Sequence, residues 1–137
     1  MKVFLDTNVL VSALTTRGLC AELFEVVLQS HQLLTSDHVL CELERILPEK
    51  LGQSEKVTKA FVDLIRTHAI LAATVQSTIT LPDPDDEPIV ASAIAENANV
   101  FVTGDKVLLG LQQVESLAIV SPRKFWELLS HRGYSAD

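Results

Sequence analysis

The chain has 137 residues, which is enough for one domain with a sizeable hydrophobic core, so we expect a single domain over residues 1–137. Apolar residues make up 47% of the chain and charged residues only 21%, which excludes a disordered protein. Eighteen acidic and 11 basic residues give a net charge of −7, which argues against a broad basic surface for duplex binding. A nucleic-acid substrate stays possible, because acidic residues that hold metal ions would account for part of the negative excess.

Membrane and disulfide classes are also disfavoured. No apolar run approaches the roughly 20 residues of a membrane span, and the N-terminal stretch MKVFLDTNVLV is typical of a buried strand rather than a secretory signal. Cys20 and Cys41 lack CxxC spacing, and the histidines show no HxH or HExxH pattern. We therefore expect a cytoplasmic protein with reduced thiols, no zinc and no membrane association.

Strands and helices are predicted to alternate along the chain. In chain order, we expect a strand at 2–5, helices at 8–14 and 19–29, a strand at 32–36, a helix at 37–47 ended by Pro48, a helix at 54–69 capped by Ser54, a strand at 70–75, an irregular segment at 77–87, a helix at 87–98, a strand at 99–102, a helix at 106–114, a strand at 117–120 and a helix at 122–133. The last residues, 133–137, are expected to be frayed.

The predicted strands are short, continuous and rich in Val, Ile, Leu and Phe, as in a parallel sheet covered on both faces. The fold class is therefore α/β, specifically a three-layer α/β/α sandwich with a central, mostly parallel sheet of about five strands.

Acidic residues follow two of these strands. Asp6 comes directly after the first strand, and Asp105 follows VFVTG. Because ligands bind beyond the carboxyl ends of strands in open α/β sheets, we expect both side chains at one edge of the sheet.

The stretch DPDDEPIV at residues 83–90 places more acidic groups at a helix start. At helical spacing, Asp86 shares the inward face with Ile89, whereas Asp85 is better placed as a helix cap and Asp83 lies in the Pro-bounded loop.

The helix at 37–47 offers a further acid, either Glu42 or Glu44, and its apolar pattern does not choose between them. Clustered carboxylates repel one another and need a compensating cation, and ligands that are all oxygen favour Mg²⁺ or Mn²⁺.

These motifs together resemble the PIN domain family. VFLDTNVLVSAL, the Glu within SDHVLCELERIL, DPDDEPIVASAIAENANVFVTGDKVLL and VSPRKFWELL are similar in order and spacing to the VapC-like toxin components of toxin–antitoxin systems, over nearly the whole chain. The resemblance implies a ribonuclease that uses Mg²⁺ or Mn²⁺, leaves a 5′ phosphate and a 3′ hydroxyl, and has an RNA substrate. It also implies a cognate antitoxin protein as partner and is compatible with a homodimer.

The same resemblance assigns site residues. It implies that the metal ligands and catalytic residues are Asp6, Glu42, Asp86 and Asp105, which selects Glu42 over Glu44 and leaves Asp85 in reserve. Asn8 and Thr103 match the polar residues that orient the site. Arg17, Lys106 and Arg123, together with Lys124, lie in or near loops and helix starts that follow strands, and are candidates for phosphate contact.

Other functions of α/β domains agree less well with the sequence. An aspartate-nucleophile phosphatase needs an aspartate two positions after the first one, where this chain has Asn8. The remaining alternative is a non-catalytic PIN-fold module that binds RNA or a protein without cleaving, which the low number of basic residues leaves open.

Overall fold

The structure is a computed structural model that describes residues 1–131. Six strands form one sheet in the order β3-β2-β1-β4-β6-β5. Their bounds are Lys2–Leu5 for β1, Gln32–Ser36 for β2, Ile70–Ala72 for β3, Val100–Val102 for β4, Gln113–Val114 for β5 and Leu117–Val120 for β6. Every neighbouring pair is parallel except β5 with β6. The mostly parallel α/β sheet is thus confirmed, with one more strand than predicted.

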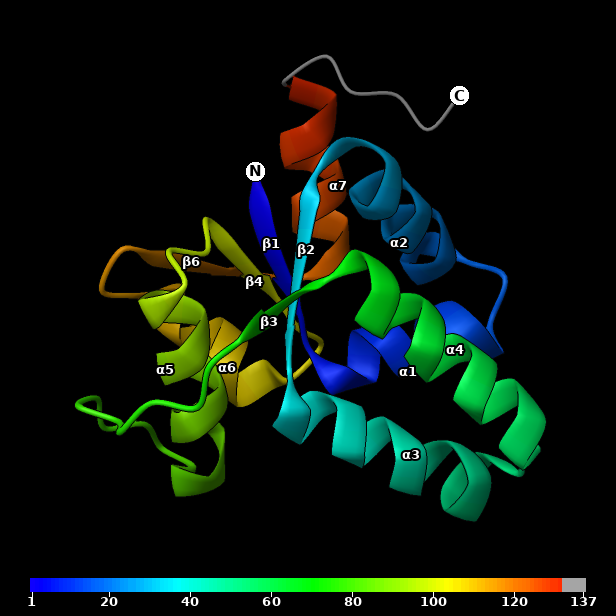
Figure 1. The fold of residues 1–137 in the computed structure, drawn as a ribbon. Helices are drawn as coiled ribbons and strands as arrows, with labels where there is room; N and C mark the ends of the chain where they lie inside the picture. The colour runs from blue at the N-terminus through cyan, green and yellow to red at the C-terminus, as the bar shows by residue number, and fades with distance from the viewer. Residues whose placement is uncertain (132–137) are drawn as a thin grey trace.

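Helices cover both faces of the sheet (Figure 1). Their bounds are Thr7–Thr15 for α1, Leu19–Ser30 for α2, Asp37–Leu51 for α3, Glu55–His68 for α4, Glu87–Ala95 for α5, Lys106–Leu111 for α6 and Pro122–His131 for α7, and Pro84–Asp86 form the 3₁₀ turn η1. Right-handed crossovers from β1 through β3 place α1 to α4 on one face. The chain then reverses direction across the sheet between β3 and β4, so α5 and α6 lie on the other face, and α7 returns to pack on α2.

The centre of the sheet fixes the position of the site. Residues Val3–Leu5 of β1 are fully buried, and the rings of Phe4 and Phe101 stack with centroids 5.2 Å apart. The backbone N–H of Asp6 donates to the carbonyl oxygen of Val102, at 2.9 Å. The carboxyl ends of β1 and β4 therefore lie side by side, immediately before Asp6 and Thr103.

Four predicted boundaries were wrong. Helix α3 does not end at Pro48 but continues to Leu51, where Gly52 ends it with a φ of 64°. Because proline has no N–H, Pro48 removes only the helical hydrogen bond to the carbonyl oxygen of Glu44, and this residue is exposed, so water can hydrate the carbonyl. Leu47 is fully buried, and its packing stabilises this turn of α3. Strand β3 ends at Ala72 rather than residue 75, and helix α5 ends at Ala95 rather than residue 98. Residues 113–114, predicted as helix, form β5 instead.

The predicted fraying of residues 133–137 and the end of the last helix at 133 lie outside the described residues. Within residues 1–131, no helix has both the length and the apolar character needed to cross a bilayer.

Candidate active site

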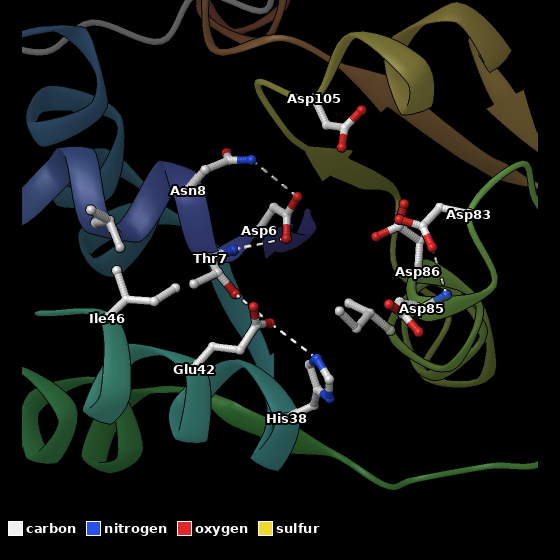
Figure 2. A pocket seen from close by; sticks show the side chains of 12 residues that line it. Asp6, Thr7, Asn8, His38, Glu42, Ile46, Asp83, Asp85, Asp86 and Asp105 are labelled. Carbon is white, nitrogen blue, oxygen red and sulfur yellow. Dashed lines mark hydrogen bonds and ion pairs between the residues drawn. The ribbon is translucent and has the colours of Figure 1, made fainter. Parts of the chain in front are cut away.

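A cleft of about 450 Å³ opens at the carboxyl ends of β1 and β4, between the starts of α1, α3 and α5 (Figure 2). The residues that line it are Asp6, Thr7, Asn8, Val11, His38, Glu42, Ile46, Asp83, Asp85, Asp86, Ile89 and Asp105. The structure therefore brings all four predicted acidic positions to one cavity, although they come from four separate parts of the chain.

Asp6 is the most tightly held of these acids. It is the N-cap of α1, and its Oδ1 accepts from the backbone N–H of Thr7 at 2.8 Å. Its Oδ2 accepts from the hydroxyl of Thr103 at 2.8 Å and from the side-chain amide of Asn8 at 3.4 Å. Both carboxylate oxygens are thus fixed by donors from α1 and from the end of β4.

Thr103 and Asn8 also join Asp6 to the loop that carries Asp105. The fully buried Thr103 hydroxyl accepts from the backbone N–H of Asp105 at 3.0 Å, and the Asn8 carbonyl oxygen accepts from the N–H of Gly104 at 3.1 Å. Asp105 itself caps α6, because its Oδ1 accepts from the backbone N–H groups of Val107 and Leu108. Its other carboxylate oxygen has no such donor within residues 1–131.

Helix α3 presents Glu42 to the cleft. Its Oε1 accepts from the hydroxyl of Thr7 at 3.1 Å, and the Nε2 of His38 lies 3.1 Å from the same oxygen (Figure 2). Glu44 is exposed and lines a separate groove between α3 and α4. Sequence reasoning did not assign roles to Thr7 or His38. The i, i+4 spacing of His38 and Glu42 on one helix was the available signal.

In the acidic segment before α5, the residue that caps the helix start is not the predicted one. Asp83, not Asp85, is the capping residue, because its Oδ1 accepts from the backbone N–H of Asp85 at 2.9 Å at the start of η1. The prediction was wrong because the chain begins to coil at Pro84, one turn before α5. Asp85 is exposed at the rim, whereas Asp86 is half-buried and no donor within residues 1–131 bonds its carboxylate.

The electrostatics of the cleft are unfavourable for bare carboxylates. Burial, and then the neighbouring charges of Asp83 and Asp105, raise the pKa of Asp86 from its ordinary 3.8 to about 6. Burial also raises the pKa of Asp6, against the hydrogen bonds from Thr103 and Thr7, which lower it. Among residues 1–131, the lining contains no lysine or arginine. The described lining therefore offers no lysine ammonium or arginine guanidinium to balance its negative charge, and its His38 imidazole contacts Glu42.

The lining residues match the chemistry of a hard divalent cation, but they are not drawn together around one. No group of three or more His, Cys, Asp or Glu side chains within residues 1–131 is close enough to hold a metal ion in the side-chain positions of this structure. The available donors are carboxylate oxygens, and those of Asp86 have no hydrogen-bond partner in the described chain. Oxygen-only donor sets suit Mg²⁺ or Mn²⁺. The residues fit this class of ion.

The predicted basic residues lie outside the cleft. Arg17, Lys106 and Arg123 are all exposed, and none lines the cavity. A second hollow of about 360 Å³ shares Asn8 and Asp105 with the cleft and is also lined by residues in the first turns of α2 and α7. Arg17 lies two residues before α2 in the sequence, and Arg123 is the second residue of α7.

Comparisons with known proteins agree with this architecture. The fold resembles VapBC2 from Rickettsia felis, solved bound to a DNA fragment from its promoter, with a TM-score of 0.63, 17% identity and coverage of 88% of this chain and 98% of that one. It also resembles VapBC-1 from nontypeable Haemophilus influenzae, with a TM-score of 0.60, 18% identity and coverage of 90% and 99%. A comparison with curated proteins gave no match. The profile of the PIN domain matches residues 2–107. The chain belongs to the PIN domain family.

Proposed function

We propose that the protein is a ribonuclease that uses Mg²⁺ or Mn²⁺ to hydrolyse RNA phosphodiester bonds, and that it is the toxin of a toxin–antitoxin pair. One observation carries the proposal. Four acidic side chains from separate elements, Asp6, Glu42, Asp86 and Asp105, line one cleft whose described lining has no lysine or arginine. Such a set is costly unless a cation joins it.

In this proposal the four carboxylates hold the ion or ions. A bound divalent cation would supply Lewis acidity and lower the pKa of a water molecule in the cleft. The chain contributes rigidity, because Thr7 and Thr103 fix the two oxygens of Asp6, and the Asp105 loop is tied to Asn8 through Gly104. These contacts keep the acids in place while the substrate binds.

The reaction adds water across one P–O bond of the RNA backbone. The water oxygen joins phosphorus, the 3′ oxygen leaves and takes a proton, and the products carry a 5′ phosphate and a 3′ hydroxyl. Arg17, Lys106 and Arg123 are the proposed contacts for flanking phosphates. The hollow beside Asn8 and Asp105 gives the strand a route from the cleft toward α2 and α7.

The toxin assignment rests on the fold neighbours. The aligned region covers 98% of the matched VapBC2 chain and 99% of the matched VapBC-1 chain. A cognate antitoxin is therefore the proposed protein partner, and we also propose that two copies of the chain form a homodimer. Copurification of the chain with the product of an adjacent reading frame, followed by measurement of the mass of the complex in solution, tests both points.

Cleavage of a labelled RNA in Mn²⁺ tests the enzymatic proposal. We expect EDTA to abolish cleavage and Asp6→Asn to reduce it strongly, because asparagine keeps the shape and the capping oxygen of Asp6 but removes its charge. Full activity in a folded Asp6→Asn protein would contradict the proposed role of Asp6.

The alternative, a non-catalytic module, makes a different prediction. Such a protein would bind RNA or a protein partner without cleavage, and millimolar Mn²⁺ would leave its melting temperature unchanged. A metal that binds only the folded state must raise that temperature by mass action.

A further inference from the structure

One carboxylate oxygen in the cleft receives two side chains from different helices. The hydroxyl of Thr7 and the Nε2 of His38 each lie 3.1 Å from Oε1 of Glu42. Within residues 1–131, no donor is bonded to the second oxygen, Oε2. The carboxylate is thus held asymmetrically, with one oxygen occupied and one open.

We infer that Thr7 and His38 are positioning residues for Glu42, which keep Oε1 occupied and leave Oε2 to bind the divalent cation. This inference rests on the proposed metal-dependent function and assigns two further residues to it. Donors on one oxygen of a ligating carboxylate restrict its rotation, and such outer contacts commonly affect metal affinity about 10- to 100-fold.

Thr7 couples two of the acids directly. Its backbone N–H donates to Oδ1 of Asp6 at 2.8 Å while its side chain donates to Glu42. Only 6% of its surface is exposed, so the hydroxyl has little access to bulk water as an alternative partner. A shift of Glu42 away from the cleft would therefore leave a nearly buried hydroxyl without an acceptor.

His38 acts from one turn earlier on α3. It precedes Glu42 by four positions on the same helix, which places the two side chains together on one surface. The contact requires a proton on Nε2, which both the Nε2–H neutral tautomer and the imidazolium carry. The positioning role is therefore independent of the charge of the imidazole. Because the His38 side chain is 52% exposed, we expect it to contribute less than Thr7.

Paired substitutions separate donation from packing. Thr7→Val keeps the shape and removes the hydroxyl, whereas Thr7→Ser keeps the donor. His38→Ala removes the donor, whereas His38→Gln restores an N–H group that can reach one turn along the helix. His68→Ala is the matched control, because His68 lies on α4 and its Nδ1 contacts the carbonyl oxygen of Leu64.

The readout is the Mn²⁺ dissociation constant, measured by electron paramagnetic resonance of free Mn²⁺. We expect Thr7→Val to weaken binding about 10-fold and His38→Ala to weaken it by a smaller factor. The Ser and Gln variants should recover most of the affinity, and His68→Ala should match the wild type. Thermal unfolding in EDTA verifies that each variant is folded. Unchanged Mn²⁺ affinity in both Thr7→Val and His38→Ala would overturn the inference.

A Glu42→Gln background tests whether the two residues act through Glu42. If they do, His38→Ala should have little further effect there, because the group that it positions has already changed. An undiminished effect would overturn the inference. Failure of the proposed function is distinguishable from failure of this inference. If the wild type binds no Mn²⁺, the proposed metal-dependent function and the positioning roles are both refuted. If the wild type binds Mn²⁺ and Thr7→Val and His38→Ala bind it equally tightly, only the positioning roles are refuted.

Discussion

Substitution of Asp86 by asparagine should stabilise the metal-free protein. The carboxylate of Asp86 has no hydrogen-bond donor in the described chain, so the substitution removes a charge without breaking a hydrogen bond within residues 1–131. A rise of its pKa from 3.8 to about 6 corresponds to about 3 kcal/mol at face value. Because the side chain is only half-buried, solvent screening reduces this to about 1 kcal/mol.

The direction of the pH dependence follows from linkage. Folding raises the pKa of Asp86, so the folded state binds the proton more tightly than the unfolded state. This contribution to wild-type stability is fully present below about pH 4 and is lost as the pH rises through about 6. The advantage of Asp86→Asn over the wild type should therefore be close to zero near pH 4 and reach about 1 kcal/mol at pH 7.5.

Urea unfolding in EDTA, followed by circular dichroism at several pH values, measures this difference. At pH 7.5 we expect a midpoint higher by about 0.5 M for Asp86→Asn. Glu44→Gln is the matched control, because Glu44 is exposed and lies outside the cleft. In saturating Mn²⁺ the order should invert, since the wild type gains binding free energy by mass action. An Asp86→Asn protein that is less stable than the wild type in EDTA at pH 7.5 would refute the argument from uncompensated charge.

Three further substitutions test the site and the fold. Glu42→Gln should reduce RNA cleavage about 100-fold or more, because it removes a charged ligand of the cation that would stabilise the developing charge, whereas Glu44→Gln should leave the cleavage rate unchanged. Ser54→Ala should lower the free energy of unfolding by about 1 kcal/mol, because the Ser54 hydroxyl caps α4 by accepting from Val57 N–H; an unchanged urea midpoint would contradict this role. Pro48→Ala should raise the free energy of unfolding by about 1 kcal/mol, because alanine restores a helical N–H group. A urea midpoint lower than that of the wild type would show that Pro48 stabilises α3.

The sequence was sufficient for the sheet and for two of the acids. Strand β4 and residues 3–5 of β1 are continuous apolar runs, and an acid that follows a parallel strand must lie at the carboxyl edge of the sheet, which located Asp6 and Asp105. The helical phase before Ile89 also placed Asp86 on the inward side, where the structure has it half-buried at the cleft.

Features decided by tertiary contacts were harder to predict. Both Glu42 and Glu44 border the apolar stripe of α3, and only the packing of α3 beside α1 shows that Glu42 meets Thr7. The cap at Asp83 depended on an additional 3₁₀ turn, and a two-residue strand such as β5 is too short to have a recognisable period.

The charge of the cleft leads to a final prediction about substrate binding. RNA phosphates and the lining carboxylates have the same sign, and the candidate basic residues, Arg17, Lys106, Arg123 and Lys124, lie outside the cavity. Repulsion between like charges is strong where solvent is partly excluded, so RNA should enter the cleft only after divalent cations bind. In EDTA, the double variant Asp6→Asn/Asp86→Asn should therefore bind a short single-stranded RNA more tightly than the wild type, although it cleaves poorly in Mn²⁺. Fluorescence anisotropy measures both affinities. Equal RNA affinity of the wild type in EDTA and in Ca²⁺ would show instead that the exposed basic residues dominate binding, because cations in the cleft would then make no contribution.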